Sequence, residues 1–227
     1  MMKFFSETNL DRLKNAMQMK MAKKGEYLFW EGEPADRLFY VFQGGVRITK
    51  TSETGKNLIL HMHQTGDLFG QIDPFQNSVQ NFSAEVTADC KVGVIMRKDL
   101  EDLLQQQHSD LAIEFMKWMG LMHRMTETKF RDLMMYGKPG ALCSLLIRLS
   151  NSYGVPSGEH TLINYKLSNT EMADMIGSTR EGVNRMLSEM RKEDAITYRN
   201  GQIVIKNVDY LRNICHCENC PLEICRM

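Results

Sequence analysis

Short apolar stretches separated by glycine turns fill the first part of the chain, from about residue 19 to residue 96. The stretches at 27–30, 38–42 and 92–95 are each only four or five residues long, and glycines such as Gly32 and Gly66 lie between stretches of this kind. Regular turns between short strands are typical of a β-sandwich or a β-roll. The pattern therefore predicts a β domain over residues 1–97.

The pattern changes at Arg97. Residues 98–136 contain no proline, a single glycine (Gly120) and many strong helix formers, which predicts a long helix. Positions at alternating steps of four and three form a heptad seam with two polar members. The helix is therefore predicted to pair with a second copy, and the alternative is packing on its own β domain. The seam positions are Phe115, Met119, Met122, Thr126, Lys129 and Leu133.

A glycine- and proline-containing segment, residues 137–140, follows the predicted helix. Such residues interrupt helices, so we expect the helix to break here and a new domain to begin, covering residues 137–209. A short helix at 141–150 and a loop at 153–158 are expected at its start. Residues 210–227 would then form a separate cysteine-rich tail.

Two capping boxes mark a pair of short helices in the new domain. Residues 168–171 read Ser-Asn-Thr-Glu and residues 178–181 read Ser-Thr-Arg-Glu, with Gly177 ending the first helix. Two short helices joined by a tight turn form a helix-turn-helix, although an ordinary helical hairpin is the alternative. Apolar residues on both sides of Asn200-Gly201 then predict a two-stranded hairpin. Helix, turn, helix and hairpin together predict a winged helix over about 166–206.

Polar side chains gather at the start of the second of these helices, which is the part of a recognition helix that meets base edges. Arginine can bind guanine and glutamate can accept a hydrogen bond from cytosine, whereas a solvated helix face is the plainer interpretation. Ser178, Thr179 and Arg199 are candidate phosphate contacts, which position a protein on DNA without reading sequence. The candidate base-reading residues are Thr179, Arg180, Glu181, Asn184 and Arg185.

Composition narrows the class of protein only slightly. With 28 basic and 28 acidic residues the formal net charge is zero, which neither supports nor excludes DNA binding. No apolar run approaches the roughly 20 residues that span a bilayer, and the first residues lack the apolar core of a secretion signal, so we expect a cytoplasmic protein without a membrane partner. The chain shows no Ser/His/Asp set, phosphate loop or HExxH motif, so we do not expect an enzyme.

Four of the six cysteines lie in the last thirteen residues: Cys215, Cys217, Cys220 and Cys225. Clustered thiols in a reducing compartment are more often metal ligands than disulfides. Cysteine thiolates select zinc or iron–sulfur clusters, and spacing alone does not choose between them. A flexible, redox-labile tail is the third possibility. Cys90 and Cys143 lie in apolar surroundings and are expected in the core.

Several of these segments resemble the Crp/Fnr family of bacterial transcription regulators over nearly the whole chain. The matching motifs are the glycine-containing segments at 24–26, 31–36, 43–47 and 66–70, and the segment 171–185. The resemblance implies an α+β fold with a cyclic-nucleotide-binding-like β-roll, a long dimerisation helix and a C-terminal winged helix-turn-helix. It also implies a homodimer that binds a double-stranded DNA palindrome and acts with RNA polymerase. Arg180, Glu181 and Arg185 match members that read a TGTGA-type half-site, while Gly182 and Asn184 depart from common choices.

The family's nucleotide binders carry a Gly-Glu pair for the ribose and, a few residues later, an Arg-Ser pair for the phosphate. Here Gly70 is followed by Gln71, and residues 77–84 contain no arginine or lysine. Burying an anionic phosphate without a cation is costly. We therefore predict that the chain binds no cyclic nucleotide.

The tail resembles the bacillus type of Fnr, an oxygen-responsive regulator of anaerobic gene expression with a [4Fe-4S] cluster. The resemblance implies one cluster per subunit, held by Cys217, Cys220 and Cys225. The fourth ligand would be Asp132 on the dimer helix, with Cys215 as the alternative. Zinc is the alternative metal. Oxygen would destroy the cluster, release the tail and thereby loosen the spacing of the two recognition helices on DNA.

Overall fold

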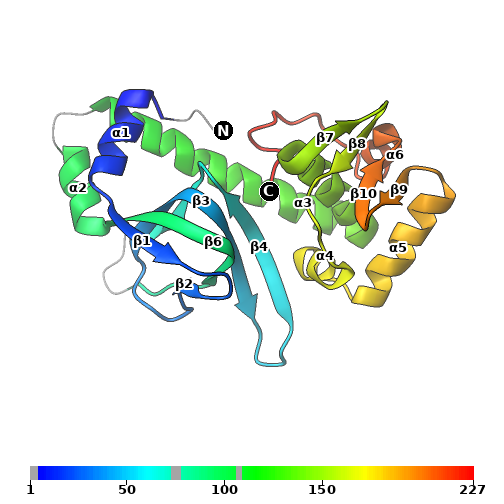
Figure 1. The fold of residues 1–227 in the computed structure, drawn as a ribbon, viewed down its shortest axis with the longest axis horizontal. Coiled ribbons are helices and arrows are strands. Elements are labelled where there is room, and N and C mark those ends of the chain that lie inside the picture. The colour runs from blue at the N-terminus through cyan, green and yellow to red at the C-terminus, as the bar shows by residue number, and fades with distance from the viewer. Residues whose placement is uncertain (1–4, 73–77, 106–108) are drawn as a thin grey trace. The chain divides into compact units, whose positions relative to one another are not determined.

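The computed structural model describes residues 5–72, 78–105 and 109–227. Contacts between residues divide the chain into two compact units, 1–120 and 121–227. The boundary falls inside the long helix α3 (Ser109–Tyr153), which therefore contributes to both units. Figure 1 shows α3 in green.

An antiparallel sheet dominates the first unit. Among the described residues it has six strands in the order β1-β6-β3-β4, with β2 paired to β6 and β5 paired to β3. Successive residues of a strand face opposite sides, and inward residues such as Val41, Val86 and Val92 are fully buried. The predicted β domain is confirmed. Its elements are α1 (Glu7–Asn15), β1 (Gln18–Ala22), β2 (Tyr27–Phe29), β3 (Asp36–Thr51), β4 (Asn57–Gln64), β5 (Leu68–Ile72), β6 (Ser83–Met96) and α2 (Arg97–Gln105).

Strand β3 pairs with β6 along much of its length and changes its other partner near Gly44. This residue has a φ of 100°, and a Cβ atom there would collide with the Asp89 carbonyl oxygen on β6. Only glycine tolerates both conditions. The β3–β6 register shifts at this point; the first part of β3 pairs with β5 and the last part pairs with β4.

The predicted break between the long helix and the next domain is a kink. Helix α3 runs from Ser109 to Tyr153, and only Gly137 leaves helical geometry, with φ 60° and ψ −164°. The helix after the kink therefore extends past the predicted end at residue 150. Upstream, α2 ends at Gln105 and α3 begins at Ser109. Residues 106–108, which the predicted helix also covers, lie outside the described residues.

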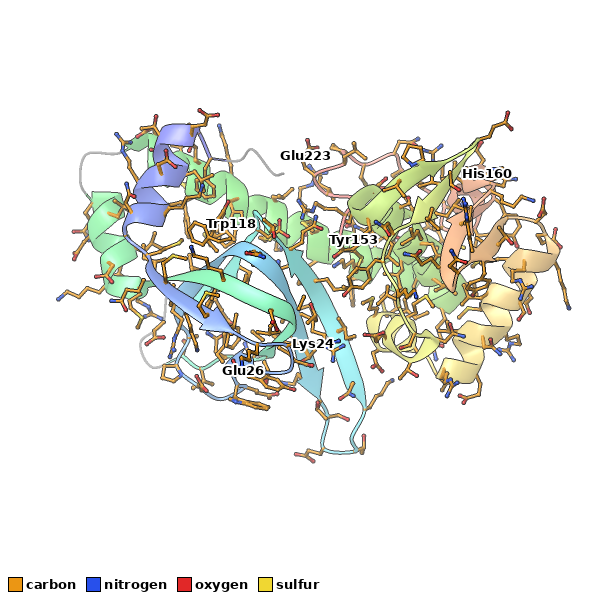
Figure 2. The ribbon with its side chains drawn as sticks, viewed as in Figure 1. Lys24, Glu26, Trp118, Tyr153, His160 and Glu223 are labelled. Atoms are coloured by element: carbon orange, nitrogen blue, oxygen red, sulfur yellow. The ribbon has the colours of Figure 1, made fainter. Side chains whose placement is uncertain are left out.

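The loop predicted at 153–158 is wrong. Residues 154–157 form strand β7 (Gly154–Ser157), which pairs with β8 (His160–Ile163). The base of this hairpin is held by Tyr153, labelled in Figure 2, whose ring stacks on Tyr165 at 4.7 Å between centroids. Glycine, proline and serine indicated a loop, but pairing with the next strand of the chain, β8, decides the conformation.

Of the six positions in the heptad seam predicted on α3, Met119 and Thr126 are exposed. Phe115, Met122, Lys129 and Leu133 are half-buried. The exposed positions at alternating steps of three and four are Met116, Met119, His123, Thr126 and Phe130. Met119 and Thr126 belong to both sets. The seam available to a second copy therefore has Met116 and Phe130 near its ends and a polar middle.

A winged helix-turn-helix forms the second unit together with the C-terminal part of α3, as predicted. Among the described residues its antiparallel sheet has the order β7-β8-β10-β9, so the predicted hairpin belongs to a four-stranded sheet. Helix α6, which the pattern did not predict, leads into the tail. The elements are α4 (Asn169–Ile176), α5 (Arg180–Lys192), β9 (Ile196–Arg199), β10 (Gln202–Ile205) and α6 (Val208–Ile214).

Candidate functional site

Helix α5 is held in place by its caps and by one apolar face. The predicted capping box at Ser168 and Glu171 is present on α4, and Gly177 ends α4 in the left-handed conformation with φ 62°. The second capping box differs by one residue, because Thr179 rather than Ser178 caps α5 and accepts from the Gly182 amide. The apolar face is buried as predicted: Val183, Met186, Leu187 and Met190.

The opposite face of α5 presents the predicted base-reading side chains to solvent. Thr179, Arg180, Glu181, Asn184 and Arg185 are all exposed. Asn184 accepts a hydrogen bond from Asn169 Nδ2 at 3.3 Å. Because α5 buries one apolar face, it presents the other as a rigid polar surface. That surface has the residue types that bind base edges in the major groove.

Two further predicted DNA contacts lie beside this face or on the wing. Ser178 is half-buried in the turn before α5. Arg199 is exposed at the end of β9 and donates from Nη1 to Ser157 Oγ at 3.2 Å. This bond links the wing to β7, so the guanidinium group is positioned by the added hairpin as well as by its own strand.

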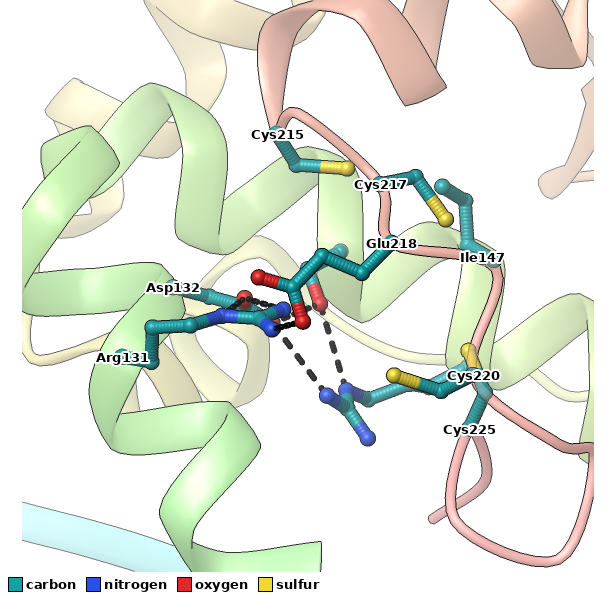
Figure 3. Close-up of a pocket in the computed structure, with 10 residues that line it drawn as sticks. Arg131, Asp132, Ile147, Cys215, Cys217, Glu218, Cys220 and Cys225 are labelled. Carbon is teal, nitrogen blue, oxygen red and sulfur yellow. Dashed lines mark hydrogen bonds and ion pairs between the residues drawn. The ribbon is translucent and has the colours of Figure 1, made fainter.

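The predicted metal ligands line one pocket in the second unit (Figure 3). Asp132 comes from α3 and the four tail cysteines face it: Cys215, Cys217, Cys220 and Cys225. Arg131, Ser144, Ile147, Arg148 and Glu218 complete the lining. Asp132 is far from the tail in the sequence, and the fold brings it into the same pocket as the tail cysteines.

The pocket is small and its donors are not at ligating distances. Its free volume is about 20 Å³, which is close to the space needed for one water. Among the described residues, no three His, Cys, Asp or Glu side chains are placed to hold one metal ion. The donor set fits a metal–thiolate centre in composition, because thiols and a carboxylate line the same pocket, and binding would require these donors to move from their present positions.

Asp132 is buried, and both of its carboxylate oxygens are occupied. Oδ1 accepts from Arg131 Nε at 3.2 Å and from Arg131 Nη2 at 2.7 Å. Oδ2 accepts from Ser144 Oγ and from Arg148 Nη2, the latter at 3.2 Å. Arg131 also forms an ion pair with Glu218 of the tail. Sequence reasoning missed these partners, although an arginine inside the apolar run 145–149 was a visible clue.

The thiols that lie deepest favour their protonated form. Burial raises the pKa of the Cys215 thiol to about 11. Burial also raises the pKa of the Cys225 thiol, an effect that the Arg148 charge partly opposes. Because the thiolate is the metal ligand, binding at these positions would release protons.

The tail also has attachments that involve no metal. Arg148 Nη1 donates to the Ile224 carbonyl at 2.9 Å, and Asn151 Nδ2 donates to the Cys225 carbonyl at 2.6 Å. The Met227 amide donates to Ser152 Oγ at 2.9 Å. The ring of Tyr136 stacks on His216 at 4.8 Å between centroids. The cysteine-rich segment is therefore docked on α3.

The other two cysteines are buried, as predicted for core residues. Cys90 Sγ donates to the Gly45 carbonyl at 3.2 Å in the first unit. Cys143 has no exposed surface, and burial raises the pKa of its thiol to about 12.

The positions used to predict the absence of nucleotide binding are only partly described. Gln71 lies half-buried on β5, beside Gly70 with a φ of 121°. Asn77, at the start of the stretch without arginine or lysine, lies outside the described residues.

Comparison with known proteins matches both units to characterised families. Residues 19–107 match the cyclic nucleotide-binding domain, and residues 140–214 match the Crp-like helix-turn-helix domain. The chain is 42% identical over 217 residues to the "Anaerobic regulatory protein" of Bacillus subtilis strain 168, covering 95% of this chain and 91% of that protein. It is 23% identical over 188 residues to a "CRP-like cAMP-activated global transcriptional regulator" of Mycobacterium tuberculosis, covering 83% and 84%.

Solved structures share the fold. FixK2 of Bradyrhizobium japonicum has a TM-score of 0.72 and 22% identity, covering 87% of this chain and 96% of that one. A CooA mutant of Carboxydothermus hydrogenoformans has a TM-score of 0.75 and 16% identity, with 89% of both chains covered. None of the described helices has the length and apolar content needed to cross a membrane.

Proposed function

Because this chain belongs to the Crp/Fnr family of DNA-binding transcription regulators, we propose that it is an oxygen-responsive regulator of anaerobic gene expression. It is not an enzyme, since its relatives are regulators. The proposal depends above all on one observation: Asp132 of α3 and the four tail cysteines line a common pocket. The relative named as an anaerobic regulator supports the same conclusion.

The residues that would hold a [4Fe-4S] cluster in each subunit are Cys217, Cys220 and Cys225, with Asp132 or Cys215 as the fourth ligand. When bound, the cluster would supply a centre that oxygen destroys. The chain's own contribution is to bring thiols from the tail to a carboxylate on α3. Carboxylate is a harder ligand than thiolate and should be displaced more easily, which suits a sensor.

DNA binding would use a homodimer formed along the exposed seam of α3. Each subunit would present one α5 to a half-site of a TGTGA-type palindrome, with Arg180, Glu181 and Arg185 toward the bases. The two recognition helices would lie about 34 Å apart, one turn of DNA. RNA polymerase is the further partner of such a regulator. The β-roll would act without a cyclic nucleotide, since Gln71 replaces the expected glutamate.

Operator binding before and after exposure to air tests the proposal. We expect anaerobically purified protein to bind a TGTGA-containing palindrome and to lose that binding in air. Arg180→Ala or Arg185→Ala should weaken anaerobic binding by about 1–3 kcal/mol and relax base preference at one position. Arg212→Ala, which removes an exposed arginine of α6 that pairs with Asp209, is the control. Equal affinity with and without air would refute the oxygen response.

A zinc site is the second candidate, because the thiol-rich donor set suits zinc equally well. Iron and acid-labile sulfide assays on anaerobically purified protein separate the two. Zinc without sulfide would leave a regulator of this family whose tail is structural.

A further inference from the structure

Arg148 is a buried cation in the second unit whose position serves neither DNA reading nor metal ligation. Its side chain is only 5% exposed. Besides the Ile224 carbonyl and Asp132, it donates from Nε to Ser144 Oγ at 3.2 Å and from Nη2 to Thr128 Oγ1 at 3.0 Å. A buried guanidinium is stable only when paired and hydrogen-bonded in this way.

These contacts join three segments of chain. Thr128 and Asp132 lie on α3 before the kink at Gly137, Ser144 lies after it, and Ile224 belongs to the tail. We propose that Arg148 is a positioning residue that keeps the pocket assembled while no metal is bound. It holds the carboxylate of Asp132 at the pocket wall and fixes the cysteine-rich tail opposite it. That the pocket binds a metal rests on the function proposed above, whereas the docking of the tail by Arg148 does not.

This role changes the expected response to metal loss. The resemblance to the family implied that the tail is released, but the bonds that Arg148 and Asn151 donate to its carbonyl groups have no metal among their partners. We therefore expect these bonds to persist, and the tail to stay docked, when a metal is lost. Since both oxygens of Asp132 are occupied, ligation by Asp132 would require it to give up a partner. Metal binding and loss then exchange the partners of Asp132 rather than free the tail.

The geometry requires arginine in particular. The guanidinium donates in two directions at once, to the tail through Nη1 and to α3 through Nη2 and Nε. A lysine ammonium keeps the charge but lacks this planar fork. Arg148→Lys therefore removes the bridge with little change in charge, and Arg148→Met removes both. Arg212→Met, on exposed α6 in the same unit, is the matched control.

Amide hydrogen exchange of the metal-free, reduced protein tests the bridge directly. The amides of Ile224 and Cys225, bonded to the Pro221 carbonyl, and of Met227 report on tail docking. We expect faster exchange of these amides in both Arg148 variants and unchanged exchange in Arg212→Met. Wild-type protection in Arg148→Lys would overturn the proposal. Should Arg148→Met fail to fold, Arg148→Lys still decides. Asn151→Ala removes the bond to the Cys225 carbonyl and should speed exchange of the tail amides less than Arg148→Lys does.

Cobalt(II) binding provides a readout that a merely structural residue would not change. Cobalt–thiolate absorption reports how many tail cysteines bind the ion. We expect Arg148→Lys to weaken cobalt binding by about 10- to 100-fold, as for other residues that orient ligands, and Arg212→Met to leave it unchanged. Unchanged cobalt affinity in Arg148→Lys would contradict the proposal. Failure of the wild-type chain to bind cobalt would count against the proposed metal site, while amide exchange would still decide the role of Arg148.

Discussion

Cys143 illustrates how a single buried thiol ties stability to pH. Its folded pKa of about 12 lies above the ordinary value of 9.0. Below pH 9 the thiol is protonated in both states and its contribution is constant. Above pH 9 the unfolded chain loses the proton first, so unfolding becomes easier until the pH reaches the folded pKa. The loss is about 1.4 kcal/mol for each pH unit over that window.

We therefore expect Cys143→Ala to be less stable than the wild-type chain at pH 7, yet to lose less stability between pH 9 and pH 11. Urea unfolding of the metal-free protein under reducing conditions at several pH values measures this. Other groups titrate in the same range, but they are common to both proteins, so the difference between the two pH profiles reports on Cys143. Parallel pH profiles for the two proteins would contradict the prediction.

Individual residues differ in how far the sequence predicts their role. Arg180, Glu181 and Arg185 were predictable because the buried stripe of α5 fixes which side of the helix faces solvent. The link between Arg148 and Asp132 was not. Its partners lie before the kink of α3 and in the tail, and no local pattern states which distant segments will meet.

At the scale of elements, the kink in α3 depends on one backbone conformation. Gly137 has φ 60° and ψ −164°, a region that is essentially restricted to glycine. A Cβ atom added at Gly137 would meet nothing closer than Pro139 Cδ at 3.8 Å. A side chain at this position therefore has enough space, but the backbone conformation is unfavourable for it. Gly120 lies in the same helix with helical geometry and open space around it.

Alanine at these two glycines should therefore have opposite effects. Gly137→Ala should lower the free energy of unfolding by about 1–3 kcal/mol. Gly120→Ala should raise it by about 1 kcal/mol, because alanine restricts the unfolded chain and favours the helix. Chemical denaturation of the metal-free protein measures both. Changes of the same sign would show that the kink does not depend on the conformation of Gly137.

Elements with strong local patterns were predicted, and those that depend on pairing were not. The caps and the Asn200-Gly201 turn fixed α4, α5 and the wing from short-range information. Strand β7 contains glycine and proline and forms only because β8 pairs with it. The face of α3 that meets a second copy stays a prediction, because apolar residues occur on both faces of the helix, one toward the protein and one toward solvent.

At the scale of the whole molecule, the exposed apolar residues of α3 offer a surface to a second copy of the chain. Met116 is 70% exposed and Phe130 is 64% exposed. Large apolar side chains at heptad spacing on one exposed face are typical of helix pairing. The middle of this seam is polar at His123 and Thr126, and His123 Nδ1 lies 3.4 Å from Glu127 Oε1. In a homodimer whose two α3 helices pair in parallel, Phe130 would meet Phe130 of the second copy.

Phe130→Glu should therefore separate the proposed dimer. The substitution removes a large apolar side chain from each copy and places two like charges together. We therefore expect the dissociation constant of the dimer to rise by about 100-fold. Operator binding should weaken with it, because one recognition helix alone contacts only a half-site. Sedimentation velocity over a range of concentrations, with operator binding on the same samples, measures both. Trp30→Glu changes an aromatic residue of the first unit that is 53% exposed and should alter neither. If Phe130→Glu stays dimeric, the contact between copies lies elsewhere; if it becomes monomeric yet binds the full operator as tightly, the two-helix recognition scheme is wrong.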